Sequence, residues 1–162
     1  MSDQTWARYI YRTGQTVGAL SAAAVVLLTI SDVVLRYFFN KAIFGSDEIT
    51  NSLLGVLVGA GLIVAAGMRI HISVDLFDAP MRRRFPSAYP RWIRMSELLG
   101  TFALAALLTR HAWNSIVNGE LTAVLEFPIG WVYAAIAVQV IGALAVLASG
   151  WRPPFAAEDE HQ

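Results

Sequence analysis

Long apolar stretches separated by short polar segments are the main feature of this sequence. Residues 13–31 carry no charge, and the apolar character continues to about residue 37. After the charged pair Asp47-Glu48, residues 49–68 are again uncharged. A helix crosses the apolar part of a bilayer with about 20 residues, each of which adds about 1.5 Å. The pattern therefore predicts transmembrane helices over about residues 13–37 and 47–69.

The second half of the chain contains two further apolar stretches. The third is the shortest, with an uncharged core at residues 98–109 between Glu97 and Arg110, and it predicts a helix over about residues 93–116. The fourth has Pro128 at its start, Trp131 and Tyr133 as interfacial aromatic residues, and apolar residues up to Gly150, so it predicts a helix over about residues 127–150. The sequence thus predicts an all-α, four-helix integral membrane domain at residues 1–152 and a polar C-terminal tail at residues 153–162.

The segment between the second and third expected helices is basic and contains several prolines. Aromatic residues are interleaved with the arginines, which is typical of an amphipathic arm that lies on a membrane surface. We expect the arm to bind anionic phospholipid headgroups, with a solvated loop as the alternative. Beside membrane spans, lipid is favoured over nucleic acid as the partner of these residues. The arginines are Arg82, Arg83, Arg84, Arg91 and Arg94.

Composition supports a membrane protein and argues against an enzyme. Hydrophobic residues make up 56% of the chain and charged residues 15%, whereas soluble domains carry about 25% charged residues. The absence of cysteine excludes disulfides and thiolate metal sites. His71 and His111 are expected at opposite sides of the membrane, so they do not form a haem ligand pair. We therefore expect no catalytic residues, metal or cofactor.

The distribution of basic residues predicts the orientation in the membrane. Of the 12 Lys and Arg residues, only Arg36, Lys41 and Arg110 lie on one side of the expected helices. Cytoplasmic segments carry the excess of Lys and Arg. Both termini and the basic arm are therefore expected in the cytoplasm.

Six positions within the expected helices carry polar or small residues of interest. Asp32 and Arg36 are four residues apart and can form an ion pair on one helix face, with a proton or ion site, or a contact to a partner chain, as alternatives. The amide of Gln139 is expected to hydrogen-bond across a helix interface. Gly55 and Gly59, followed by Gly61, are expected to form a small-residue face where another helix approaches closely.

The pattern R-Y-x-F-N at residues 36–40 is followed by Glu48, then by Gly61, and then by H-I-x-V-D at residues 71–75. With this pattern, residues 32–75 resemble the small membrane subunit (DctQ type) of tripartite ATP-independent periplasmic (TRAP) transporters. The order and spacing match the family over about a quarter of the chain. One departure is that the family usually has a tryptophan before the glutamate, where this chain has Gly45-Ser46-Asp47.

This resemblance implies a sodium-driven importer of organic acids or related solutes in the bacterial inner membrane. A soluble periplasmic protein would capture the solute, and a large DctM-type membrane subunit would carry it. The small subunit would be an immobile scaffold. The alternatives are a small four-helix proton-coupled exporter and an accessory membrane subunit of a redox enzyme.

Within that scaffold, we expect two polar clusters that hold the helices or the subunit interface in place. At the periplasmic end, Arg36, Asn40 and Glu48 should tie the first helical hairpin together. At the cytoplasmic end, the residues around the H-I-x-V-D pattern should act similarly, or should simply cap the helix. The full set of expected structural residues is Asp32, Arg36, Tyr37, Asn40, Glu48, Gly61, Arg69, His71 and Asp75.

Overall fold

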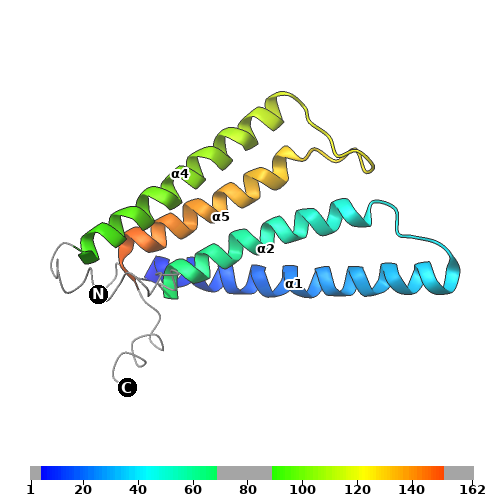
Figure 1. Cartoon of the computed structure of the whole chain (residues 1–162), viewed down its shortest axis with the longest axis horizontal. Helices are drawn as coiled ribbons and strands as arrows, with labels where there is room; N and C mark the ends of the chain where they lie inside the picture. Colours follow the sequence, from blue (N-terminus) through cyan, green and yellow to red (C-terminus); the bar gives the residue numbers. More distant parts are fainter. Residues whose placement is uncertain (1–4, 69–88, 152–162) are drawn as a thin grey trace, which may run out of the picture.

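The computed structural model describes residues 5–68 and 89–151 and consists of four α-helices in these ranges. These are α1 (Thr5–Phe39), α2 (Ser46–Met68), α4 (Tyr89–Val117) and α5 (Gly130–Ser149), drawn in Figure 1. By length and composition, all four helices can cross a membrane, α4 over Arg91–Val117. The expected all-α membrane fold with four spanning helices is confirmed.

Two helices begin earlier than the apolar pattern predicts. Helix α1 begins at Thr5 rather than near residue 13, because Ala7 and Tyr11 are buried against Val146 and Trp151 of the last helix and its end. The rings of Tyr11 and Trp151 lie 5.2 Å apart. The charged residues of this segment limit the apolar span but do not limit the helix.

Helix α4 begins at Tyr89, so the exposed Arg91 and Arg94 belong to this helix and not to a separate arm. Helix α5 begins at Gly130, slightly later than expected, because Pro128 pairs with Leu121 in the preceding connection. The rest of the predicted arm, including Arg82, Arg83 and Arg84, and the predicted tail lie outside the described ranges. The other expected residues outside these ranges are Arg69, His71 and Asp75.

The helices form a single layer in the order α1, α2, α5, α4 (Figure 1). Helix α2 packs against both α1 and α5, and α4 packs against α5. The start of α1 and the ends of α2 and α5 lie together at one end of the layer, which we call the terminal end. The connections at residues 40–45 and 118–129 lie at the opposite end, which we call the loop end.

The apolar core lies at the terminal end, where α1, α2 and α5 converge. One cluster contains Tyr11, Val146 and Trp151, and a neighbouring cluster contains Ile63 and Leu147. On α1, the buried residues up to Ser21 recur every three or four positions, which is the spacing of one helix face. Beyond Ser21, the only buried residue of α1 is Asp32. The loop end is therefore held by contacts of a different kind.

Candidate functional site: two carboxylates at the loop end

Asp32 attaches the connection at residues 40–45 to α1. Its Oδ2 accepts a hydrogen bond of 2.8 Å from Arg36 Nη2, one helical turn further along. Its Oδ1 accepts a 2.8 Å bond from the backbone N–H of Ile43, and the Ser46 side chain lies close to the carboxylate. The spacing predicted the ion pair with Arg36. The bond from Ile43 adds a second function, since it brings the connection that leads into α2 back to α1.

Asn40 ends α1 instead of joining a polar cluster. Its φ of 49° is in the left-handed region, which Asn tolerates better than most residues. The chain can therefore turn out of the helix, and the N–H of Lys41 bonds to the carbonyl of Leu35 at 3.3 Å. This bond satisfies one of the carbonyl groups that a helix end leaves free.

Glu48 binds the other connection of the loop end and not the first helical hairpin. Its two carboxylate oxygens accept hydrogen bonds from the backbone N–H groups of Val124 at 2.7 Å and Leu125 at 3.0 Å. The expected cluster of Arg36, Asn40 and Glu48 is therefore wrong, because Arg36 pairs with Asp32 and Glu48 binds the connection at residues 118–129. Ser46 faces Asp32, and residues two positions apart on a helix point about 200° apart, so Glu48 points away from α1.

The connection that Glu48 binds is folded as a short hairpin over residues 120–129. The N–H of Thr122 bonds to the carbonyl of Phe127 at 2.9 Å, and the N–H of Phe127 bonds to Thr122 Oγ1 at 3.0 Å. At its base, the N–H of Ile129 bonds to the carbonyl of Glu120 at 3.2 Å. Glu126 turns the tip with a φ of 52°. This conformation directs the tip N–H groups toward Glu48.

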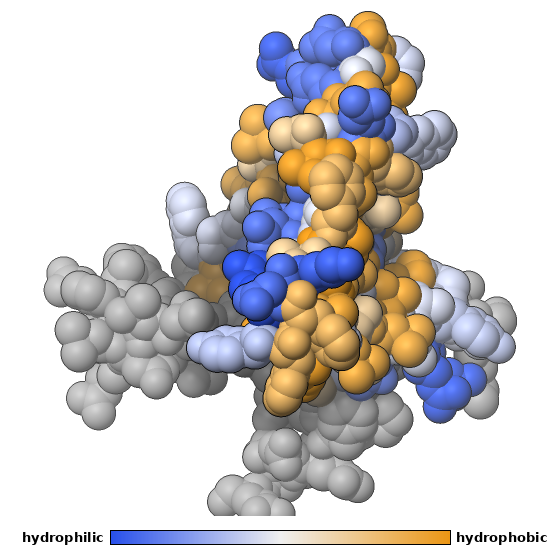
Figure 2. All heavy atoms as spheres, turned by 90° about the vertical axis from the view of Figure 1, so that its right-hand side faces the viewer, coloured by the Kyte–Doolittle hydropathy of each residue, from blue (hydrophilic) through white to orange (hydrophobic). Residues whose placement is uncertain are grey.

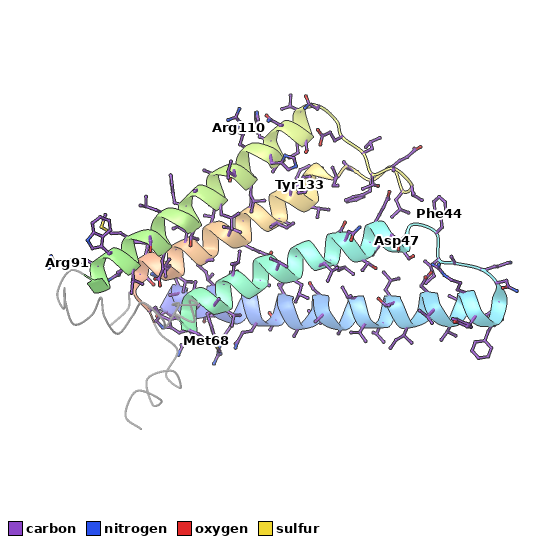
Figure 3. All side chains as sticks on the ribbon, viewed as in Figure 1. Phe44, Asp47, Met68, Arg91, Arg110 and Tyr133 are labelled. Carbon is purple, nitrogen blue, oxygen red and sulfur yellow. The ribbon has the colours of Figure 1, made fainter. Side chains whose placement is uncertain are left out.

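Gly45 provides the space in which the hairpin lies over the start of α2. A Cβ atom at this position would lie 2.5 to 2.8 Å from the side-chain carbons of Leu125. The φ of Gly45 is 72°, which also favours glycine. Figure 3 shows Phe44 and Asp47, which lie before and after this glycine in the sequence, at the loop end near the tip of the hairpin.

Below the hairpin, α2 and α5 border an open and mainly apolar hollow of about 600 Å³. Ile49, Leu53 and Val56 line it from α2, and Val132 lines it from α5. Phe127 covers it at the hairpin. Glu48, Ser52 and Thr122 also line the hollow, but the Glu48 carboxylate is already bonded to two backbone N–H groups. The hollow is therefore mainly a surface for apolar packing.

Gly55 and Gly59 allow α5 to approach α2 closely. A Cβ atom at Gly55 would lie 2.7 Å from Ile136, and one at Gly59 would come into contact with the amide oxygen of Gln139. That oxygen is buried, and it has no hydrogen-bond partner in the described part of the chain. Gly61 is exposed and has no atom near its missing Cβ, because it lies two residues beyond Gly59 and points away from α5. The three glycines therefore do not share one face.

We expect Gly59→Ala to destabilise the fold by about 1–3 kcal/mol, because Gln139 or a whole helix must move to accept the methyl group. Thermal unfolding of the purified protein in detergent, followed by circular dichroism, measures this effect. Gly61→Ala is the matched control, and it should be neutral or stabilising by up to about 1 kcal/mol. Equal stability of the two variants would contradict the close contact.

The remaining polar and aromatic residues of the loop end do not form a reactive site. Tyr37 is 83% exposed, and His111 of α4 packs on the ring of Tyr133 at 4.5 Å. In residues 5–68 and 89–151, no group of three or more His, Cys, Asp or Glu side chains is placed to hold a metal ion. The geometry serves to fix backbone segments in place.

The hairpin and its glycine contact are features that sequence reasoning missed. Asn118-Gly119 is a turn signal, and Gly119 has a φ of 63°. That signal predicts a turn after α4, but not that its tip reaches α2. Gly45 and Gly130 both lie where another segment approaches closely, and the sequence pattern did not predict this role for either residue.

A comparison with protein families identifies the chain. The model of the family described as "Tripartite ATP-independent periplasmic transporters, DctQ component" matches residues 25–152, well over half of the sequence. No curated protein and no solved structure is significantly similar. The family is a transporter component, so the expectation that this chain is not an enzyme is confirmed. The match includes α2, α4, α5 and both carboxylates of the loop end, and the chain is therefore a member of the DctQ family, the small membrane component of TRAP transporters.

Proposed function

We propose that this chain is the stationary scaffold of a sodium-driven importer of an organic acid or related solute. Its partners would be a large DctM-type membrane subunit and a soluble periplasmic solute-binding protein. The observation that best supports a scaffold is the use of the two acids at the loop end. Asp32 and Glu48 both accept hydrogen bonds from backbone N–H groups of the connections. An acid that carries an ion must exchange its partners during transport, whereas these contacts hold the helices at fixed positions.

The single-layer arrangement also supports a subunit that packs against a larger partner. Most residues of α1 and α4 are exposed, and many of them are apolar, such as Leu27, Leu99 and Leu107. These faces can contact lipid or the helices of another membrane protein. A large subunit on one face of the layer would leave the fold of this chain unchanged.

Reconstitution into vesicles tests the proposed function directly. We expect no solute uptake by this chain alone, and uptake only when the large subunit, the binding protein and an inward sodium gradient are all present. A proton gradient in place of the sodium gradient is the control for the exporter alternative. Uptake or efflux by this chain alone would contradict the scaffold assignment.

Asp32→Asn separates a structural role of the acid from an ion-carrying role. The asparagine can still accept the N–H of Ile43, but it loses the charge that pairs with Arg36. We expect fewer assembled complexes and an unchanged transport rate per assembled complex. Co-purification gives the amount of complex, and uptake gives the rate. A fully assembled complex with no transport would instead indicate an ion site at Asp32.

We also propose that the loop end faces the periplasm and that both termini lie in the cytoplasm. The chain has no cysteine, so single cysteines can be labelled without a background. A cysteine at Lys41, at the loop end, should react with an impermeant maleimide in intact spheroplasts. A cysteine at Arg91, at the terminal end, should react only after lysis. The reverse result would invert the orientation.

A further inference from the structure

The second half of α1 leaves the other helices. Its side chains between Ser21 and Asp32 are not buried, and large apolar residues there are exposed, for example Leu27 at 65% and Ile30 at 56%. In a helix that crosses a membrane, such residues are surrounded by hydrocarbon. The end of α1 therefore reaches the membrane surface largely uncovered by the other helices, and Asp32 is its one buried residue.

The end of this helix carries aromatic side chains in nearly every direction. Tyr37, Phe38 and Phe39 are 83%, 79% and 65% exposed, and Phe44 in the following connection is 73% exposed. Consecutive helical residues point about 100° apart, so the three adjacent rings cover most of the circumference of the helix. A protein partner would cover one side of it. The boundary between lipid and water surrounds a helix completely, and aromatic side chains are enriched there.

Two cationic side chains accompany the rings. The Arg36 side chain is 60% exposed although one of its nitrogens bonds to Asp32, and its remaining N–H groups are available for other acceptors. Lys41 is also exposed. Figure 2, which looks onto the loop end, shows apolar and hydrophilic residues side by side over its lower part, where α1 ends. Phosphate groups of lipids are acceptors that both side chains can reach by extending along the helix.

The length of α1 limits how the helix can lie in the membrane. From Trp6 to Phe39 the helix rises about 50 Å at about 1.5 Å per residue. The bilayer with its headgroups is only about 40–45 Å thick. Both aromatic ends can lie within it if the helix is inclined by about 30°, which is within the range of tilts that membrane helices adopt.

We propose that residues 36–44 form an anchor that binds the phospholipid headgroup layer at the loop end and thereby holds α1 inclined in the membrane. The anchor comprises Arg36, Tyr37, Phe38, Phe39 and Phe44, with Lys41 in the connection. The occupant of this surface is lipid, and not a binding protein or a second copy of the chain. The proposal depends on the membrane-spanning fold alone, and it stands or falls independently of the scaffold function.

Spin labels on single cysteines test the anchor in the full chain. Cysteine replaces Tyr37, Phe38, Phe39 or Phe44, one at a time, in vesicles of phosphatidylethanolamine and phosphatidylglycerol. Relaxation by oxygen and by a water-soluble nickel chelate reports the depth of each label. We expect all four labels at headgroup depth, and a control label at Leu27 deep in hydrocarbon. A label at 37, 38 or 39 that lies in water, or that is shielded from both reagents, would overturn the proposal.

Removing the rings tests the inclination. The triple variant Tyr37→Ser, Phe38→Ser, Phe39→Ser should allow α1 to stand more upright, so a label at Phe44→Cys should move from the headgroups into water. Phe102→Ser, at an exposed aromatic position within α4, is the control and should leave that label in place. Circular dichroism confirms that each variant is folded. A label at 44 that does not move in the triple variant would refute the role of the rings in tilting the helix.

Discussion

Gly130→Ala should reduce the stability of the protein by about 1–3 kcal/mol, toward the upper value, because the added methyl group meets backbone and not only side chain. Its Cβ would lie 2.6 Å from Ile116 Cγ1 and 2.9 Å from the backbone nitrogen of Ile116. A side chain can rotate away, but this nitrogen belongs to the last turns of α4. Helices α4 and α5 must therefore separate at the base of the hairpin. Thermal unfolding in detergent, measured by circular dichroism, gives the loss.

Gly100→Ala is the control for this prediction, since Gly100 lies in α4 with no atom within 4 Å of its missing Cβ. Alanine is a better helix former than glycine, so this variant should be as stable as the natural protein or more stable by up to about 1 kcal/mol. If Gly130→Ala unfolds at the same temperature as Gly100→Ala, the close approach of the two helices is not present in the protein.

Glu48→Ala should release the hairpin from α2. The N–H groups of Val124 and Leu125 lose their acceptor, and the other hydrogen bonds of the hairpin lie within it or join it to α4 and α5, not to α2. We expect hydrogen exchange at these two amides to rise to near the rate of an exposed loop. Exchange followed by mass spectrometry of the peptide that contains them measures the effect. Glu48→Gln retains one carbonyl acceptor and should give an intermediate rate.

Asp47→Ala is the matched control, because Asp47 is the neighbouring exposed acid in the same helical turn. It changes the net charge by the same amount, and exchange at Val124 and Leu125 should not change. Equal acceleration in both variants would mean that charge at the start of α2, and not the two hydrogen bonds, controls the hairpin.

The features that sequence reasoning predicted depend on short-range patterns. The four spanning helices follow from uncharged stretches of sufficient length, and the pair of Asp32 and Arg36 follows from their separation by one helical turn. The start of α1 was placed too late because charged residues near Arg12 mark the limit of hydrocarbon, whereas a helix can continue into the headgroups. Local composition carries no information about that continuation.

The partner of Glu48 could not be predicted for a different reason. The two residues whose N–H groups bond to Glu48 lie 76 and 77 positions away in the sequence. They depend on how far the hairpin leans over α2, which is determined by backbone turns at Gly119 and Glu126 and by the space at Gly45. A turn can be expected from Asn118-Gly119, but the direction of its tip depends on the packing of two helices. The family pattern identified Glu48 as important, and only the fold shows what it binds.

The order of the helices in the layer has a consequence for biogenesis. The α1–α2 and α4–α5 contacts each join helices that follow one another in the chain. Either pair of helices can therefore form as soon as its own two segments have been synthesised. The α2–α5 seam, and the smaller contact between the start of α1 and the end of α5, require both halves. The α1–α2 pair can thus enter the bilayer while α4 and α5 are still on the ribosome. Packing of α5 against α2 over Gly55 and Gly59 then completes the fold.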